Sequence, residues 1–212
     1  MPPSHSPRGL RPKNPTAVGQ SHPSHALDWL WRDLADVSHP GVLDCGPVSP
    51  ITVDVLLRRH AKVHVGDIIT PLLREEARFW ERQGKTSVFR TQDFLEQFPS
   101  ISFHSVSAIL GWHVLDLLPR EAHQSLLDRW LSYLHPGGLL FFLLREPRLE
   151  KGSEITWWLE DLKVLGSDPS GRRAFSHPPL TNREVERLAP PGSVKTFLTR
   201  SGWREVLVSK QE

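Results

Sequence analysis

The sequence predicts a doubly wound α/β fold, in which helices cover both faces of a parallel sheet that ends in an antiparallel hairpin. Strand-like and helix-like segments alternate along residues 41–144, the pattern of right-handed crossovers in a parallel sheet. The run LLFFLL at 139–144 has no polar alternation, as expected of a central strand covered on both faces. Near the end of the chain, only RSG (200–202) joins two strand-like runs, a loop short enough for a hairpin.

Length and composition limit the class of protein. The 212 residues suit one sizeable domain, and 38% apolar with 24% charged residues is a globular composition. The longest apolar run, 137–144, is far below the about 20 residues that span a bilayer, so we expect no membrane helix. The N-terminus lacks the apolar stretch of a secretory signal, and the single cysteine, Cys45, cannot form an internal disulfide. We therefore expect a cytoplasmic protein.

The basic charge is concentrated in an N-terminal tail. Residues 1–24 are rich in Pro, Ser and His with little to bury, so we expect them to be disordered and the domain to cover 25–212. Arg8, Arg11 and Lys13 precede the first acid, which leaves 23 of the 26 Lys and Arg residues against 24 acids. Nucleic acid is not an expected partner, because the domain has no cluster of basic residues.

The first half of the domain contains three expected strands and three helices. A helix over 24–37 begins at Ser24 as cap, and the strand GVLDCG (41–46) leads to a helix from the Ser49 cap to about His60. The strand KVHVGD (62–67) precedes a helix over 70–84, for which Thr70 is the cap and Gly84 the stop. TSVF (86–89) is a weak third strand.

The second half adds the fourth and fifth strands and the closing hairpin. SVSAIL (105–110) is the fourth strand, a helix follows Pro119, and 139–144 is the fifth strand. Another helix begins with a capping box of Thr181 and Glu184, ahead of the hairpin formed by the runs SVKTFLT and WREVLVS.

Residues 146–179 form an expected insertion between the fifth strand and the capping box. A helix over 153–166, capped by Ser153, is expected within it. Because this segment directly follows the fifth strand, the helix should lie over the carboxyl edge of the sheet, where open α/β sheets bind ligands. It is either a lid or a packed flank helix.

The order of these parts resembles the class I S-adenosylmethionine-dependent methyltransferases, which have a Rossmann-like sheet of five parallel strands and a closing antiparallel hairpin. The resemblance spans about residues 42–208 and implies S-adenosyl-L-methionine as cofactor, with a small molecule or peptide as methyl acceptor. Six segments carry it, in the family's order: VLDCG, VHVGDI, TQDF, SAILGWHVLDLLP, LSYLHPGGLLFFLL and LTNREVERL.

The turn after the first strand keeps only one of the expected glycines, Gly46. At the two following glycine positions stand Val48, for which a left-handed backbone costs roughly 1–2 kcal/mol, and Pro50, which has no amide to meet a phosphate. This pattern disfavours a dinucleotide more than it disfavours S-adenosylmethionine, which has no phosphate. It leaves open a non-catalytic binding or scaffold protein that kept only the fold.

The resemblance also assigns roles to four residues around the donor. Asp44 would lie near the donor's amino-acid part, or instead cap the loop amides. Asp67 ends the second strand about twenty residues after the loop, where an acid can accept both ribose hydroxyls. Asp93 would contact the adenine amino group beside Phe94, unless it only begins a short helical turn.

Gly111, Trp112 and His113 fall where the methyl group would meet its acceptor. His113 is a candidate general base because its ordinary pKa is near neutrality, or else a packed core histidine. Ser107 stands where the family often has an acid, which also favours a non-catalytic protein. The histidines show no spacing typical of metal ligands, so no metal site is predicted.

Overall fold

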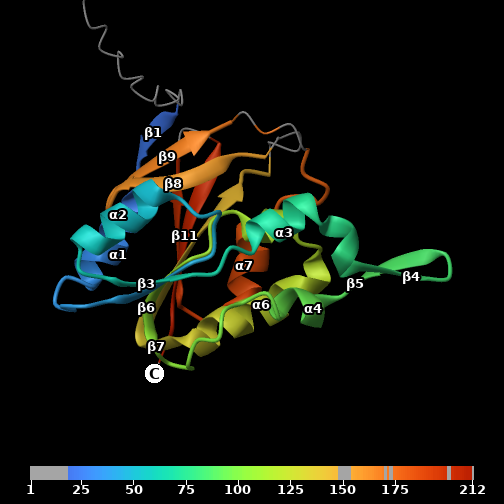
Figure 1. Cartoon of the computed structure of the whole chain (residues 1–212), viewed down its shortest axis with the longest axis horizontal. Coiled ribbons are helices and arrows are strands. Elements are labelled where there is room, and N and C mark those ends of the chain that lie inside the picture. The colour runs from blue at the N-terminus through green and yellow to red at the C-terminus, as the bar shows by residue number, and fades with distance from the viewer. Residues whose placement is uncertain (1–18, 148–153, 170, 172–173, 200–201, 212) are drawn as a thin grey trace, which may run out of the picture.

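The computed structural model describes residues 19–147, 154–169, 171, 174–199 and 202–211. Its centre is a six-stranded sheet in the order β10-β11-β7-β6-β2-β3, with helices against both faces (Figure 1). The expected α/β class and Rossmann-like layering are present.

Four neighbouring strands form the parallel part of the sheet: β2 (Gly41–Asp44), β3 (Lys62–Val65), β6 (Val106–Leu110) and β7 (Leu134–Arg145). Every residue of β2 and β6 is buried, as is β7 from position 138 onward. The three strands at the centre of the sheet therefore contribute most to the core, and their carboxyl ends meet at one edge.

The C-terminal hairpin closes the sheet. Strands β10 (Val194–Leu198) and β11 (Trp203–Ser209) pair antiparallel, and β11 also pairs antiparallel with β7. The antiparallel strand β11 thus lies between β7 and β10.

Most of the predicted helix starts are confirmed. Ser24 caps α1 (His25–Asp33), and Ser49 caps α2 (Pro50–Arg58), in each case by accepting a backbone N–H of the first turn. The capping box of Thr181 and Glu184 opens α7 (Asn182–Leu188). Helix α1 packs against β7, β10 and β11 on one face, and α7 lies on the other face with α6 (Arg120–Tyr133) (Figure 1).

The predicted helix over 70–84 is wrong after residue 74. Helix α3 (Ile69–Arg74) starts one residue before the expected cap, and a 3-10 turn, η1 (Glu76–Phe79), leads from it into strand β4 (Trp80–Gln83). Gly84 has φ 65° and lies in the two-residue loop to β5 (Thr86–Phe89), a position that requires a left-handed backbone.

The expected third strand, TSVF, therefore pairs with β4 and not with the central sheet, which has four neighbouring parallel strands instead of five. Phe79, Phe89 and Phe94 form an aromatic cluster at the base of this hairpin, and its tip extends away from the body (Figure 1). Among the described residues, no strand covers the outer edge of β3.

The predicted helix over 153–166 is also wrong. This segment forms β8 (Thr156–Asp161) and β9 (Val164–Asp168), which join β1 (Gln20–Pro23) in a three-stranded antiparallel sheet. Buried and exposed side chains alternate along β8, which is the period of a strand. Ser153, the expected cap, lies outside the described residues.

Strand β1 also corrects the boundary of the expected tail, because residues 20–23 pair with β9 while 1–18 lie outside the described residues. The small sheet packs against α2, where the Leu159 N–H donates to the buried Thr52 hydroxyl at 3.0 Å. It therefore holds one end of the insertion against the first helix after β2.

Candidate functional site

The candidate site lies at the carboxyl edge of the parallel strands. Asp44, the last residue of β2, is paired in register with Val65 of β3 and Leu110 of β6. The turns after these three strands therefore begin side by side, which is where open α/β sheets bind ligands. They carry the predicted residues Gly46, Asp67 and Gly111.

Asp44 is buried and holds the first turn together. Its Oδ1 accepts the Gly46 N–H at 3.0 Å and the indole N–H of Trp112 at 2.6 Å. Burial raises the pKa of the Asp44 carboxyl to about 6, although these two hydrogen bonds act against the rise. Its alternative role as a cap of the loop amides is thus present.

Gly46 is required by a close approach. A Cβ placed there would lie 2.6 Å from the Cδ1 and Nε1 atoms of Trp112, closer than real Cβ atoms come to any neighbour. The ring of Trp112 therefore lies directly on the glycine turn, with 1% of its surface exposed.

The backbone at Trp112 is strained, since its φ is 48°. A left-handed conformation costs roughly 1–2 kcal/mol for a residue other than glycine. Two hydrogen bonds to β7 hold the chain in place: Leu143 N–H to Trp112 O at 2.8 Å, and Gly111 N–H to Phe141 O at 2.7 Å. The surroundings thus determine where the indole lies.

Asp67 begins α3. Its Oδ1 accepts the N–H groups of Ile69 at 3.1 Å and Thr70 at 2.8 Å, so the acid and not Thr70 caps this helix. Both bonds use the same oxygen, and Oδ2 is the atom that could meet ribose hydroxyls.

The third predicted motif divides between solvent and core. Asp93 lies in α4 (Thr91–Leu95), is 44% exposed and forms an ion pair with Arg90 at 2.9 Å. Phe94 is fully buried, edge-on to Phe79 with ring centroids 5.7 Å apart. Asp93 and Phe94 thus begin and anchor a short helix, which is the structural role that we expected as the alternative to an adenine contact.

Gly111 and His113 lie among large rings. A Cβ on Gly111 would come within 2.9 Å of the Trp130 ring, so packing alone requires glycine there. His113 precedes α5 (Val114–Leu117), and its imidazole is edge-on to Phe175 and to Trp203.

The environment of His113 contradicts the expected general base. The side chain is 2% exposed, and neither ring nitrogen has a hydrogen-bond partner among the described residues. Burial lowers the pKa of the imidazole to about 3, and the positive charge of Arg145 acts in the same direction. A neutral, enclosed imidazole does not take up protons near neutral pH, so His113 fits the packed core histidine better.

The space beside Trp112 is small. Within the described residues, the hollow beside Trp112 and His113 has a volume of about 10 Å³, room for about one water molecule. Pockets that hold small-molecule ligands have volumes of about 300–1,000 Å³. Val48 is 66% exposed, so the ring of Trp112, and not Val48, fills the space at the turn. S-adenosylmethionine does not fit this arrangement.

Charged residues beside the site were missed by the sequence analysis. Asp116 in α5 accepts the backbone N–H of Arg145 at 2.7 Å and lies 3.6 Å from its Nε. Burial raises the pKa of Asp116 to about 6, opposed by the charge of Arg145. The available signal was an arginine at the end of the apolar run 139–144.

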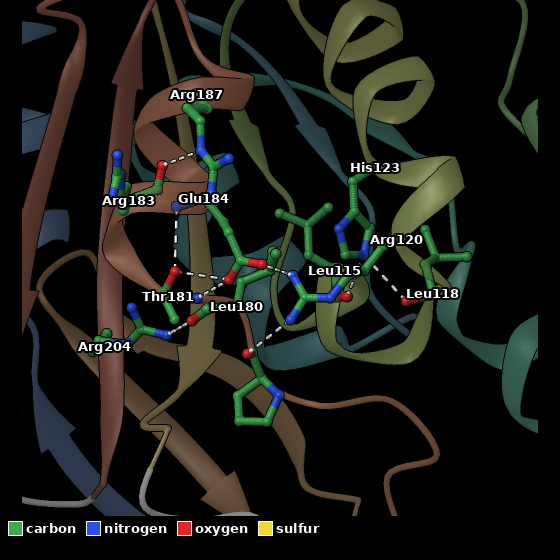
Figure 2. A network of polar contacts seen from close by, with 11 residues as sticks. Leu115, Leu118, Arg120, His123, Leu180, Thr181, Arg183, Glu184, Arg187 and Arg204 are labelled. Atoms are coloured by element: carbon green, nitrogen blue, oxygen red, sulfur yellow. Dashed lines mark hydrogen bonds and ion pairs between the residues drawn. The ribbon is translucent and has the colours of Figure 1, made fainter.

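Three arginines fix the segment that enters α7. Arg145 donates to the carbonyl of His177 at 2.6 Å, and Arg120 donates to that of Pro179 at 3.4 Å. Arg204 donates to the carbonyl of Leu180. Figure 2 shows Arg120 also paired with Glu184 of the capping box, and His123 directed at the carbonyls of Leu115 and Leu118.

Within the part of the chain that the structure describes, no three His, Cys, Asp or Glu side chains gather closely enough to hold a metal ion. None of the helices in the same residues has the length and apolar character to cross a membrane.

No protein-family profile matches the sequence, and no curated protein matches it. In structure, the chain is similar to S-adenosylmethionine-dependent methyltransferases. The 1,6-didemethyltoxoflavin-N1-methyltransferase of Burkholderia thailandensis, solved with S-adenosylhomocysteine, has TM-score 0.49 and 15% identity over 88% of this chain and 77% of that one. A methyltransferase of Methanosarcina mazei has TM-score 0.47 and 16% identity over 82% and 93%. The N-methyltransferase NodS of Bradyrhizobium japonicum has TM-score 0.46 and 15% identity over 88% and 94%.

The fold described above rests on the strand order and pairing of this chain itself.

Proposed function

We propose that this chain is an S-adenosylmethionine-dependent methyltransferase that acts on a small-molecule or peptidic acceptor. One arrangement supports the proposal: Asp44 and Asp67 follow two adjacent parallel strands, and between them lies the turn at Gly46, where another group comes close. An acid after the second strand can bind ribose hydroxyls, and such a turn can serve a donor that has no phosphate.

The proposal gives each edge residue a part. Asp44 and Gly46 belong to the amino-acid side of the donor, and Asp67 Oδ2 belongs to the ribose. Asp93 and Phe94 belong to the adenine side, where buried Phe94 would keep α4 fixed. Because Trp112 fills the turn, each of these contacts requires a state in which its ring has moved.

A non-catalytic binding or scaffold protein is the second candidate. The observation that favours it is the indole of Trp112, which lies on Gly46 and donates to Asp44. Such a protein keeps the fold, and the residues around the turn at Gly46 serve only as part of the core.

Titration of the full chain with S-adenosylhomocysteine, followed by calorimetry, tests the proposal. The titration is run on the natural chain and on Trp112→Gly, each with and without Asp67→Asn. Asparagine still caps a helix well but lacks the second carboxylate oxygen, so the fold is kept while the ribose contact is weakened. Asp54→Asn is the matched control, because Asp54 is an exposed acid on α2, paired with Arg58.

Binding that Asp67→Asn weakens by about tenfold, and that Asp54→Asn leaves unchanged, supports the methyltransferase proposal. If neither the natural chain nor Trp112→Gly binds, the proposal is wrong and the scaffold reading stands. Binding of NADH without binding of S-adenosylhomocysteine would contradict both.

A further inference from the structure

Trp112 differs from the buried tryptophans Trp31 and Trp157 in how it is held. Its indole N–H donates to a carboxylate, whereas the indole N–H groups of Trp31 and Trp157 have no hydrogen-bond partner among the described residues. Its backbone is left-handed, while Trp31 lies in the regular helix α1. Strained residues of this kind persist where the surroundings fix them, and they cluster at functional sites.

The place that the indole occupies is a ligand position by its geometry. A glycine in the turn after the first strand lets a bound group approach the backbone. At Gly46 the approaching group is the Trp112 ring, with two ring atoms 2.6 Å from where a Cβ would be. The indole N–H also donates a hydrogen bond to Oδ1 of Asp44, the acid at the end of the same strand.

We infer that Trp112 is a built-in occupant of the donor site, and that an S-adenosyl ligand binds only after its indole has left the turn at Gly46. The inference rests on the proposed function, since it concerns the same edge. It makes Trp112 the residue that determines access, while Asp67 contributes to affinity.

Two features of the structure make the displacement local. The side chain is held to the turn by a single hydrogen bond, to Asp44, together with its ring contacts. The hydrogen bonds of the backbone on either side, Leu143 N–H to Trp112 O and Gly111 N–H to Phe141 O, do not involve the ring. Moving the ring would therefore break none of the hydrogen bonds that pair the connection between β6 and α5 to β7.

Trp112→Gly is the direct test, because glycine accepts the left-handed backbone and removes the ring. Trp31→Ala is its matched control: Trp31 is also buried, at 5% exposure, but it lies on α1 rather than at a glycine turn. Affinity for S-adenosylhomocysteine is measured by calorimetry on the natural chain and both variants. We expect Trp112→Gly to bind at least about tenfold more tightly than the natural chain, and Trp31→Ala to match the natural chain.

Equal affinity of the natural chain and Trp112→Gly would overturn the inference and leave the proposed function standing. Absence of binding by both would overturn both. An equal gain in affinity for S-adenosylhomocysteine in Trp31→Ala and Trp112→Gly would also overturn the inference, because removing either buried ring would then have the same effect.

Trp112→Phe covers the case in which the glycine variant loses its cooperative thermal unfolding. Phenylalanine keeps an apolar ring but cannot donate to Asp44, so the ring should leave the turn more readily. Binding at least about threefold tighter than in the natural chain supports the inference, and unchanged affinity overturns it.

Discussion

Two buried aspartates at the carboxyl edge have similar surroundings but different partners. Asp44 and Asp116 are each 1% exposed, and burial raises the pKa of each carboxyl to about 6. Asp44 accepts from two neutral groups, the Gly46 amide and the Trp112 indole. Asp116 accepts a backbone N–H of Arg145 and faces its guanidinium.

The two acids differ in what it costs to remove the partner of each buried carboxylate. When a neutral donor leaves a buried acid, the acid can be protonated and no unpaired charge remains. When a buried ion pair is broken, a charge is left in the core, at a cost of about 3–5 kcal/mol. The turn at Gly46 is therefore the part of the edge that can open, and the end of β7 is the fixed part.

The largest effect is expected at the charged partner. Asp116→Ala leaves the Arg145 guanidinium buried without its acid, so the free energy of unfolding should fall by about 3–5 kcal/mol. Asp44→Ala leaves neutral donors unsatisfied and should cost about 1–3 kcal/mol. Urea unfolding of the two variants at neutral pH measures both values. A larger loss for Asp44→Ala would reverse the comparison.

The pH dependence of the free energy of unfolding tests whether the Asp44 carboxyl is buried. The pKa of this acid is about 6 in the folded chain and 3.8 when exposed, so the folded state binds the proton more tightly. Its contribution to stability is complete below 3.8 and is lost as pH rises through about 6, to a total of about 3 kcal/mol. Asp44→Asn does not titrate, so across this window the natural chain should lose about 3 kcal/mol relative to the variant.

Urea unfolding at a series of pH values measures this relative loss. Asp54→Asn, a change at an exposed acid on α2, serves as the control and should run parallel to the natural chain. Parallel curves for Asp44→Asn as well would show that Asp44 is not desolvated.

A smaller effect is expected at Asp67, the neighbouring acid, which is partly buried. Asp67→Ala removes the acceptor of the Ile69 and Thr70 amides and should cost about 1 kcal/mol, as loss of a helix cap does. Asp67→Asn should restore most of it. Thermal unfolding of the pair measures the cap alone, and a loss shared equally by both variants would show that charge and not capping matters.

The smallest effect is expected at the exposed arginine. Arg120 fixes the same segment as Arg145, but its side chain is 41% exposed and its ion pair with Glu184 is in contact with solvent. Arg120→Ala should therefore cost less than about 1 kcal/mol. A loss as large as that of Asp116→Ala, in the same urea experiment, would show that the segment and not the buried charge sets the stability of this edge.

The fold was predictable wherever local chemistry and packing agree. Ser24, Ser49 and the box of Thr181 and Glu184 begin helices as expected, because each cap acts within its own first turn. The helix expected over 153–166 failed because its apolar residues fit a helical period as well as a strand period, and pairing with β1, which is distant in sequence, favours the strands.

The candidate site was less predictable. Asp44, Gly46 and Asp67 do meet at one edge, because the ends of parallel strands do so by construction. The position of Trp112 depends on a left-handed backbone and on contacts across three strands. The local sequence GWH (111–113) predicts neither feature.

The hairpin of β4 and β5 has a practical consequence for anyone who handles this protein. Arg82 lies near the end of β4, and Lys85 lies in the exposed two-residue turn at the tip of this arm, which extends from the body (Figure 1). Brief treatment with trypsin should therefore cut here before it cuts the folded body. The two pieces should stay associated, because the aromatic cluster at the base of the arm joins both sides of the cut.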